Sequence, residues 1–451
     1  MKLPPLPPAL IRNLFHPVYR ALRGENISKL LGELDEAQWL PAERLEEIQW
    51  RRLLKLLDHV STHVPYYRDL LEAEGIRVSE IGNIGDFASI PFLTKEIIRE
   101  NGDRMASRDP VRKGYATSTG GSTGDTLYFC CDSAAAPIRR ANTWRQLQNL
   151  GIEIGDRQMR FWGFAFEKSR AKRAAKVIKR FLNNLRTVST FDLSEQRMKE
   201  YAGLERYFRP SLIVAYPSAL ALFADFCGKA GLELHPPRAI VTSGEQLYPH
   251  QKESIESAFA APVYNRYGSR EFADVACECP RREGLHISND LYVVELIHRS
   301  GRPAEEGETG EIVVTDLSNY YMPFIRYRTG DLAVRTARMC SCGRGMPLLQ
   351  SVEGRAFDVI VTGEGKAVGG FFWTHLSRSV PGIRSFQIEQ DDPGRATFRI
   401  VPGPDWKDAY IEALEKELRA TCGEGFVVDF RIVEDIPLTR SGKSKFIISD
   451  I

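Results

Sequence analysis

Alternation between apolar strand-like runs and helical runs is the feature that most restricts the fold of this chain. Short apolar runs occur at Met159–Phe164, Leu212–Ala215 and Ala239–Thr242, and a helical pattern at Leu220–Gly228 separates the last two. Such alternation is typical of proteins in which helices cover the faces of a mainly parallel sheet. The predicted fold class is α/β, with a large N-terminal α/β body of mixed sheets.

Later runs predict two further units. Glu311–Thr315 and Leu332–Val334 indicate a β-rich subdomain that closes the body. Beyond Gly354 the composition shifts, and strand and helix patterns alternate over about 100 residues, a normal domain size. They fall at Asp358–Val361, Phe371–Ser379, Ser385–Glu389, Ala396–Val401, Trp406–Thr421 and Val427–Val433. We therefore expect an N-terminal domain over 1–353, a hinge at 354–358 and a small α+β C-terminal domain over 359–451.

The stretch Thr117–Asp125 combines three glycines with five hydroxyl side chains in nine positions. Its glycines can adopt positive φ, so backbone N–H groups can approach a ligand closely, and its hydroxyls add short donors. The donors are Ser118, Thr119, Gly120, Gly121, Ser122, Thr123 and Gly124. Such a loop can hold anionic oxygens without a formal charge, which favours phosphate and hence a nucleotide. An ordinary polar surface loop is the alternative.

This loop differs from the phosphate-binding loop of a typical P-loop nucleoside triphosphatase. A strand-like run, Leu127–Cys131, follows it where that motif would start a helix. It also lacks the lysine of that motif, and Asp125 stands after the last glycine instead. The loop is therefore not that of a typical P-loop nucleoside triphosphatase, and Asp125 has no explanation in the sequence.

Composition limits the compartment and the partners. The chain has 451 residues, 27% of them charged, and a net charge of +2, which gives no electrostatic case for nucleic acid. No run of 18 apolar residues predicts a transmembrane helix, and the proline-rich N-terminus is a poor secretory signal. We expect a cytoplasmic protein. Composition leaves open whether the protein forms a homodimer. Residues 1–25 are basic and aromatic and could rest on the body, a partner or an anionic membrane; packing on the body is favoured.

Eight cysteines in such a protein are expected as free thiols or metal ligands. Cys279 precedes His286 by seven residues, and Cys340-Ser-Cys342-Gly forms a tight turn that can aim two thiolates at one ion. Three sulfurs and one imidazole suit tetrahedral zinc. Cys277 competes with Cys279, and buried free thiols beside an unrelated histidine remain the alternative.

Six segments in order carry a resemblance to a known family. After the glycine-rich loop come Thr242–Glu245, Tyr264–Glu271, Tyr327–Leu332, Gly354-Arg355 with Asp358, and Pro437–Lys443. The set resembles the adenylate-forming superfamily of acyl-CoA synthetases, luciferases and peptide-synthetase adenylation domains. Within it, residues 35–451 are most similar to the phenylacetate–CoA ligase family, in the branch found with capsule and polysaccharide genes.

The resemblance implies ATP, Mg²⁺ and coenzyme A as reactants and cofactors. It assigns the glycine-rich loop, including Thr123 as a catalytic residue, to the ATP phosphates, and Glu271 to Mg²⁺. Asp331 would accept hydrogen bonds from the ribose hydroxyls. The remaining nucleotide contacts implied are Ser243, Gly244, Glu245, Asn265, Arg266, Tyr267, Gly268 and Arg355.

The family pattern also assigns a moving lysine. Lys443 lies eight residues from the C-terminus, and the matching family lysine swings in with the small domain to contact the carboxylate and the α-phosphate. A long flexible ammonium suits this role. The second half-reaction implies rotation of that domain at Gly354-Arg355. Phe357 stands where many relatives have a polar or charged residue, which puts the hinge in question.

The resemblance further implies a structural zinc at Cys279, His286, Cys340 and Cys342, and an acyl pocket near Trp162, Tyr216 and Tyr267. Aromatic side chains there could stack on an aromatic acid or belong to the core. An alternative is an acidic or sugar-linked substrate held by Arg160, Arg266 and Arg270.

The function predicted is activation of a carboxylic acid as an acyl-adenylate, with pyrophosphate release, and transfer of the acyl group to coenzyme A. Two alternatives remain open. The adenylate could pass to an amine or hydroxyl, as in decoration of a surface polysaccharide, or the chain could be a nucleotide-binding protein without catalysis.

Overall fold

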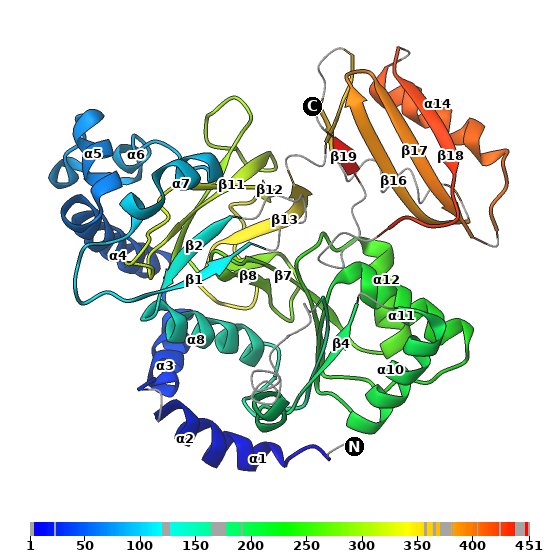
Figure 1. Cartoon of the computed structure of the whole chain (residues 1–451), viewed down its shortest axis with the longest axis horizontal. Helices are drawn as coiled ribbons and strands as arrows, with labels where there is room; N and C mark the ends of the chain where they lie inside the picture. Colours follow the sequence, from blue (N-terminus) through cyan, green and yellow to red (C-terminus); the bar gives the residue numbers. More distant parts are fainter. Residues whose placement is uncertain are drawn as a thin grey trace.

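A computed structural model of the chain describes residues 4–21, 24–119, 127–163, 177–190, 193–355, 359–363, 367–369, 380, 382–403, 405–423, 425–437 and 447–449. Figure 1 shows a large body and a smaller C-terminal unit, which lies near α12. This arrangement confirms the predicted α/β body and separate α+β C-terminal region.

One mixed sheet runs through the body. Across the described residues it contains 11 strands in the order β10-β11-β12-β13-β9-β8-β7-β6-β5-β3-β4. The strands are β3 (Gln158–Trp162), β4 (Leu185–Ser189), β5 (Leu212–Ala215), β6 (Ala239–Thr242), β7 (Val263–Ser269), β8 (Ala273–Glu278), β9 (Leu285–Ile287), β10 (Tyr292–Ile297), β11 (Thr309–Asp316), β12 (Tyr327–Arg335) and β13 (Leu348–Arg355). The strands from β4 to β7 pair in parallel, and those from β7 to β10 pair antiparallel. The β-rich subdomain therefore continues the parallel sheet through β7 and β8.

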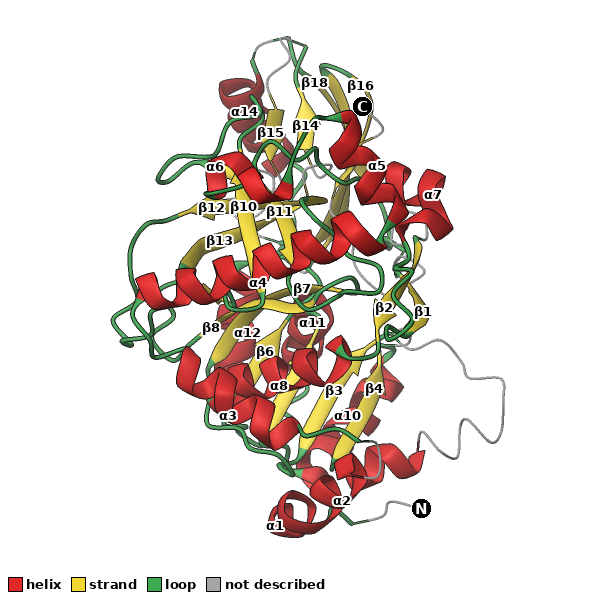
Figure 2. Ribbon diagram, turned by 90° about the vertical axis from the view of Figure 1, so that its left-hand side faces the viewer, coloured by secondary structure: helices red, strands yellow, loops and turns green. Residues whose placement is uncertain are grey.

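Helices cover both faces of the parallel strands. One face packs against α10 (Glu195–Phe208), α11 (Pro217–Lys229) and α12 (Pro249–Phe259), and the other packs against α8 (Ala135–Gln148). Figure 2 shows the strands between these two layers. Because β5 and β6 are buried along their whole length, they read as continuous apolar runs.

Three elements of this region were not predicted from the sequence, namely β4, α10 and α12. β4 reads Leu-Arg-Thr-Val-Ser, and only Val188 in it is fully buried. It lies at the edge of the sheet, where the outer side has no strand partner among the described residues. An edge strand of mixed polarity lacks the apolar run that identifies its buried neighbours.

The N-terminal helices form a layer on the antiparallel strands and beside α8 (Figure 2). They are α3 (Ile27–Ala37), α4 (Ala42–His63), α5 (Pro65–Ala73), η2 (Val78–Glu80), α6 (Ile84–Phe87), α7 (Lys95–Asn101) and η3 (Gly102–Met105). Pro65 separates α4 from α5, because the residue before a proline prefers an extended backbone. Thr94 caps α7 and accepts a hydrogen bond from the Ile97 N–H at 3.4 Å.

The N-terminal arm packs on the body. It consists of α1 (Pro8–Leu10), the π-helical turn η1 (Ile11–Phe15) and α2 (His16–Ala21). Asn184 holds its start, since its side chain accepts from the Leu6 N–H at 2.9 Å and donates to the Leu6 carbonyl at 2.8 Å. Among the three positions considered for the arm, the structure confirms contact with the body.

The C-terminal unit has its own sheet and core. The sheet order is β18-β17-β16-β19, and α14 (Tyr410–Cys422) packs on it around Phe398 and Leu414. Its strands are β14 (Val359–Val361), β15 (Ala367–Gly369), β16 (Ile383–Asp392), β17 (Arg395–Pro402), β18 (Val427–Ile432) and β19 (Ile447–Ser449), with β14 and β15 forming a separate hairpin. The helix predicted at 371–379 lies outside the described residues.

Buried ion pairs join distant segments of the body. Arg145 of α8 donates to both carboxylate oxygens of Asp290, at 2.9 and 3.0 Å, and to the Leu34 carbonyl at 3.0 Å. This guanidinium links α8 to α3 and to the segment before β10. In the part of the chain that the structure describes, none of the helices combines the length and apolar character needed to cross a membrane.

Candidate functional site

The carboxyl ends of the parallel strands bring several predicted site residues to one edge of the sheet. Trp162 ends β3, Tyr216 follows β5, and Ser243 follows β6. Asn265 is the last residue of β7 that pairs with β6. In open α/β sheets this edge is where ligands bind, because helix starts and loops meet there.

Two predicted acyl-pocket residues contact each other at this edge. The rings of Trp162 and Tyr216 stack with centroids 4.1 Å apart and planes at 29°. Burial, with the nearby Glu245, raises the pKa of Tyr216, so its phenol stays protonated at neutral pH. The pair forms a rigid aromatic wall beside the strand ends.

Glu245 fixes the loop after β6. Its Oε2 accepts from the Ser218 N–H at 3.1 Å and from the Ser218 hydroxyl at 2.6 Å. The preceding Gly244 has φ +84°, a left-handed conformation that favours glycine. The motif Thr242–Glu245 therefore forms a tight turn bound to the start of α11, and Ser218 is a partner that sequence reasoning did not assign.

A second group of predicted site residues includes Tyr267 of β7 and Asp331 of β12. The Tyr267 hydroxyl donates to Asp331 Oδ2 at 2.9 Å, although 64 residues separate them. Burial, then the Asp331 carboxylate, raises the pKa of Tyr267 well above its usual range, so the phenol remains a donor. Thr329 adds a further hydrogen bond to this phenol and accepts from the Asp331 N–H at 3.1 Å. The structure thus orients a carboxylate that the sequence alone could only place in a turn.

Glu271 belongs to the same group. It is 8% exposed, and the Tyr327 hydroxyl donates to its Oε1 at 3.3 Å. It is near enough to Tyr267 to raise the pKa of that phenol further. Gly268 lies between them, and a Cβ atom there would meet the Ala273 carbonyl oxygen at 2.3 Å. Only glycine allows this close backbone approach.

The neck of the glycine-rich loop is closed by hydrogen bonds. It joins β1 (Gly114–Ser118) to β2 (Tyr128–Asp132), which pair antiparallel. The Thr119 N–H donates to the Leu127 carbonyl, and the Leu127 N–H donates to Thr119 Oγ1, both at 2.9 Å. The hydroxyl of Thr119, predicted to bind phosphate, is therefore already used as an acceptor in the neck.

Several predicted site residues lie outside the described residues, namely Gly120, Gly121, Ser122, Thr123, Gly124, Asp125, Phe357, Asp358 and Lys443. The backbone of Arg355 is described, and it pairs with Asp331 across β12 and β13. The end of β13, where the hinge is predicted, therefore lies directly beside the Tyr267–Asp331 group.

The predicted zinc ligands converge on one point. Cys279, His286, Cys340 and Cys342 each place one ligand atom within 4.8 Å of the others. Cys279 Sγ is 3.6 Å from Cys340 Sγ, and Cys342 Sγ is 3.4 Å from His286 Nε2. Two sulfurs bound at about 2.3 Å to one tetrahedral ion would lie about 3.8 Å apart, so the donor set fits zinc.

The protonation state of His286 also agrees with metal binding at this cluster. Burial, then the Arg344 charge, lowers the pKa of His286 to about 4, so its imidazole is neutral at pH 7. A neutral imidazole can donate a lone pair to a metal. Cys277 does not join the cluster and packs near Arg266 and Asp274 instead, which removes it as a competitor.

Sequence reasoning missed the partner of Arg266. Asp274 Oδ1 lies 3.2 Å from Arg266 Nε, and Asp274 Oδ2 accepts from the Thr143 hydroxyl at 2.6 Å. The pair spans the β7–β8 hairpin, whose register shifts at Tyr267. That shift could not be predicted from the spacing of the two residues.

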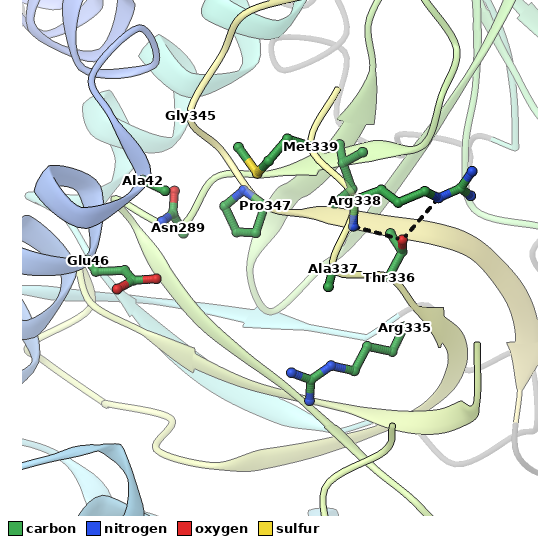
Figure 3. Close-up of a pocket in the computed structure, with 11 residues that line it drawn as sticks. Ala42, Glu46, Asn289, Arg335, Thr336, Ala337, Arg338, Met339, Gly345 and Pro347 are labelled. Atoms are coloured by element: carbon green, nitrogen blue, oxygen red, sulfur yellow. Dashed lines mark hydrogen bonds between the residues drawn. The ribbon is translucent and has the colours of Figure 1, made fainter. Parts of the chain in front are cut away.

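A hollow of about 290 Å³ lies away from these groups, between α4 and the segment that connects β12 to β13 (Figure 3). Figure 3 shows Glu46 on its helix side and Arg335 and Arg338 on its strand side. None of the predicted nucleotide or acyl residues lines it. We therefore place the candidate site at the strand ends and not in this hollow.

Sequence comparison connects the chain with two kinds of protein. Residues 360–450 match the family described as the CapK C-terminal domain. The chain is 26% identical to a phenylacetate-coenzyme A ligase of Thermus thermophilus over 72% of this chain and 74% of that protein. It is 23% identical to the protein CapK of Staphylococcus aureus over 90% of both chains.

Structural comparison extends the likeness to the C-terminal unit. A crystal structure of 2-hydroxyisobutyryl-CoA ligase in the postadenylation state, in complex with R3-HIB-AMP, has a TM-score of 0.75 at 19% identity. The likeness covers 92% of this chain and 91% of that chain. The same ligase with 2-HIB-AMP and CoA in the thioesterification state has a TM-score of 0.61. The fold is shared in both cases.

Proposed function

Because the chain belongs to the phenylacetate–CoA ligase-like family of adenylate-forming enzymes, we propose that it activates a carboxylic acid with ATP and then transfers the acyl group to coenzyme A. The observation that carries this proposal is the group formed by Tyr267, Glu271 and Asp331 at the edge where the parallel strands end. It gathers residues from two separated motifs into a site with two carboxylates and a protonated phenol.

In the first step, the carboxylate of the acid attacks the α-phosphorus of ATP and releases pyrophosphate. Negative charge spreads over phosphate oxygens in the transition state, so donors must be fixed beforehand. We assign Ser118 to Gly124 to the phosphates and Asp331 to the ribose hydroxyls. Glu271 offers hard oxygens to Mg²⁺, which would neutralise phosphate charge when bound. The hydrogen bond from the Tyr267 hydroxyl holds the Asp331 carboxylate in one orientation.

The remaining roles follow the same arrangement. Ser243, Gly244, Glu245, Asn265 and Gly268 would line the nucleotide, and the Trp162–Tyr216 stack would form one wall for the acyl group. Lys443 would contact the carboxylate and the α-phosphate, delivered by the unit that follows the hinge at 354–358. Thr123 would donate to the phosphates.

We also propose a structural zinc at Cys279, His286, Cys340 and Cys342. Four protein ligands leave no open position for substrate, so the ion would stabilise the fold without taking part in the reaction. The cluster joins the β8–β9 connection to the β12–β13 connection, and β12 carries Asp331. The cytoplasmic location and the homodimer remain predictions.

A second acceptor is favoured by one observation, the likeness to CapK over 90% of both chains. The adenylate could be passed to an amine or hydroxyl of a surface polysaccharide. Both reactions share the first step and differ only in the acceptor. A nucleotide-binding protein without catalysis would bind ATP and perform neither.

Pyrophosphate–ATP exchange over a panel of aromatic, aliphatic, amino and uronic acids tests the proposal. We expect at least one acid to stimulate exchange, and CoA to yield a thioester. Lys443→Ala should lower exchange about 100-fold, because a cation at developing phosphate charge contributes on this scale. The exposed Lys416→Ala on α14 is the matched control and should leave exchange unchanged. ATP binding without any exchange would contradict the proposal, and exchange without thioester would favour the amine or hydroxyl acceptor.

A further inference from the structure

Two histidines and an aspartate from separate segments meet at the C-terminal end of α4. His59 and His63 are four residues apart on α4, so they lie on the same face of this helix. Asp109 lies in the segment that leads from η3 to β1. Each of the three residues places one possible ligand atom within 4.8 Å of the others. None of them belongs to the candidate nucleotide and acyl site or to the cysteine–histidine cluster.

Backbone hydrogen bonds join the two segments that carry these residues. The Arg108 N–H donates to the His63 carbonyl at 2.7 Å, and the Ser107 N–H donates to the Tyr321 carbonyl at 2.6 Å. The Ser107 hydroxyl oxygen accepts from the Asp109 N–H at 3.2 Å. The backbone therefore holds Asp109 beside the end of the helix, and its carboxylate is not needed for this purpose.

A backbone carbonyl decides which ring nitrogen of His59 is available to a ligand. His59 is 8% exposed, and its Nε2 lies 2.9 Å from the Tyr320 carbonyl oxygen. Because a carbonyl can only accept, the proton of the neutral ring belongs on Nε2, and Nδ1 keeps the lone pair. The Ser107 hydroxyl oxygen, 3.1 Å from the same Nε2, is a second acceptor. Histidines that bind metals commonly donate their other ring nitrogen to a carbonyl in this way.

The other two side chains also keep electron pairs for a ligand. The His63 ring lies with its centroid 5.0 Å from that of His59, and it makes no hydrogen bond or ion pair among the residues that the structure describes. Asp109 Oδ1 accepts from the Val111 N–H at 3.0 Å. Its Oδ2 lies 3.8 Å from Arg112 Nε, which is beyond hydrogen-bond distance.

Arg112 is a neighbouring cation that a bound metal ion must tolerate. Its Nη1 lies 3.5 Å from Asp132 Oδ2, and its guanidinium carbon lies over the Tyr320 ring, 4.4 Å from the centroid. Asp132 is buried, so its carboxylate offsets the arginine charge at short range. Arg112 therefore has a carboxylate of its own, and Asp109 remains for the ion.

We propose that His59, His63 and Asp109 bind a divalent transition-metal ion at a site separate from the cysteine–histidine cluster. Two imidazoles and one carboxylate suit zinc and similar ions. Donor atoms bound at about 2.0–2.1 Å to one tetrahedral ion lie about 3.4 Å apart, so the side chains must draw together by at most about 1.5 Å. His63 and Asp109 are partly exposed, so solvent reaches the site and water can complete the coordination.

Such an ion would tie the end of α4 to the segment that enters β1. Asp109 comes shortly before β1, and β1 leads into the glycine-rich loop. An ion that binds only the folded protein stabilises it by mass action. We therefore expect zinc to raise the melting temperature of the wild-type protein even when the cysteine–histidine cluster is already filled. This inference does not depend on the proposed reaction.

Equilibrium dialysis of the full chain against buffered free zinc, followed by metal analysis, tests the site. We expect wild-type protein to bind about one more zinc ion per chain than His63→Gln at the same free zinc. His63→Gln and Asp109→Asn should each weaken binding of this ion by more than about 100-fold, because loss of a ligand should exceed the 10–100-fold cost of losing an outer partner. His250→Gln, at an exposed position on α12, is the matched control and should keep the ion.

The outcomes separate this site from the cysteine–histidine cluster. An ion that His63→Gln and Asp109→Asn lose and Cys342→Ser keeps supports the inference. Equal zinc content in wild type and His63→Gln overturns it, whether or not the cluster holds zinc. Both substituted positions are partly exposed, and a thermal melt without added zinc shows that each variant is folded. The zinc-dependent rise in melting temperature should be absent in His63→Gln, and its persistence there would also overturn the inference.

Discussion

Gly268 shows how one residue holds the site together. Its missing side chain lets β7 approach the Ala273 carbonyl so closely that a Cβ atom would lie 2.3 Å from that oxygen. We expect Gly268→Ala to shift the backbone beside Tyr267, to lower the melting temperature and to reduce exchange at least 10-fold. Gly203→Ala on α10 is the control, since no atom lies within 4 Å of its new Cβ, and it should stabilise the helix by about 0.5–1 kcal/mol. Wild-type exchange in Gly268→Ala would contradict this role.

Glu205 is a second residue with a measurable signature. It is fully buried on α10, where its Oε2 accepts from the His235 N–H at 3.1 Å. Burial raises the pKa of Glu205 from its usual 4.5 to about 7, and the His235 hydrogen bond offsets part of this shift. Because the folded state binds this proton more tightly, the stability it contributes is complete below pH 4.5 and is lost as the pH rises through 7.

Glu205→Gln keeps the acceptor and removes the charge. Urea unfolding should therefore show the variant to be more stable than wild type at pH 8.5, by up to on the order of 3 kcal/mol, with the gap closing near pH 4.5. Glu200→Gln, an exposed position on the same helix, should shift stability by less than about 0.5 kcal/mol at either pH. A difference that does not change with pH would exclude titration of Glu205 as its source.

At the scale of elements, the four-residue cluster links β9 and the residue after β8 to the connection between β12 and β13. Cys279 follows β8, His286 lies in β9, and Cys340 and Cys342 lie between β12 and β13. We expect about one zinc per chain in the purified protein. Cys342→Ser should lose the metal and lower the melting temperature, whereas Cys277→Ala should keep the metal, because Cys277 lies outside the cluster. Folded wild-type protein without any bound metal would refute the site.

At the scale of the whole molecule, we propose that the end of β13 acts as the hinge between the two units. Gly354 has φ +97° and lies at the predicted hinge. Gly354→Ala should disfavour the present arrangement by about 1–2 kcal/mol, since a Cβ atom is strained in this conformation. We expect pyrophosphate exchange to fall about 5–30-fold more than thioester formation from preformed acyl-adenylate, because that energy changes a population by this factor.

Gly301 offers a control for this strain. It has φ +86° in the turn after β10, and no atom lies within 4 Å of an added Cβ. Gly301→Ala should cost similar stability and leave the ratio of the two half-reactions unchanged. Equal effects of Gly354→Ala on both half-reactions would argue against a hinge at this position.

Local sequence patterns determined which segments are strands and helices, and which chemical groups the site contains. β5, β6 and the break at Pro65 follow from apolar runs and proline geometry, which act over a few residues. β4 was not predicted, because an edge strand need not be apolar. The cysteine–histidine set was predicted from donor types, since zinc prefers sulfur and imidazole wherever they can converge.

Only the tertiary structure decided which of these groups meet. Tyr267 contacts Asp331 across 64 residues, Cys279 rather than Cys277 reaches Cys340, and Arg266 finds Asp274 through a shift in register. Each contact depends on the order and register of strands across the sheet. A one-residue slip would turn a side chain to the opposite face, and the local pattern does not record that choice.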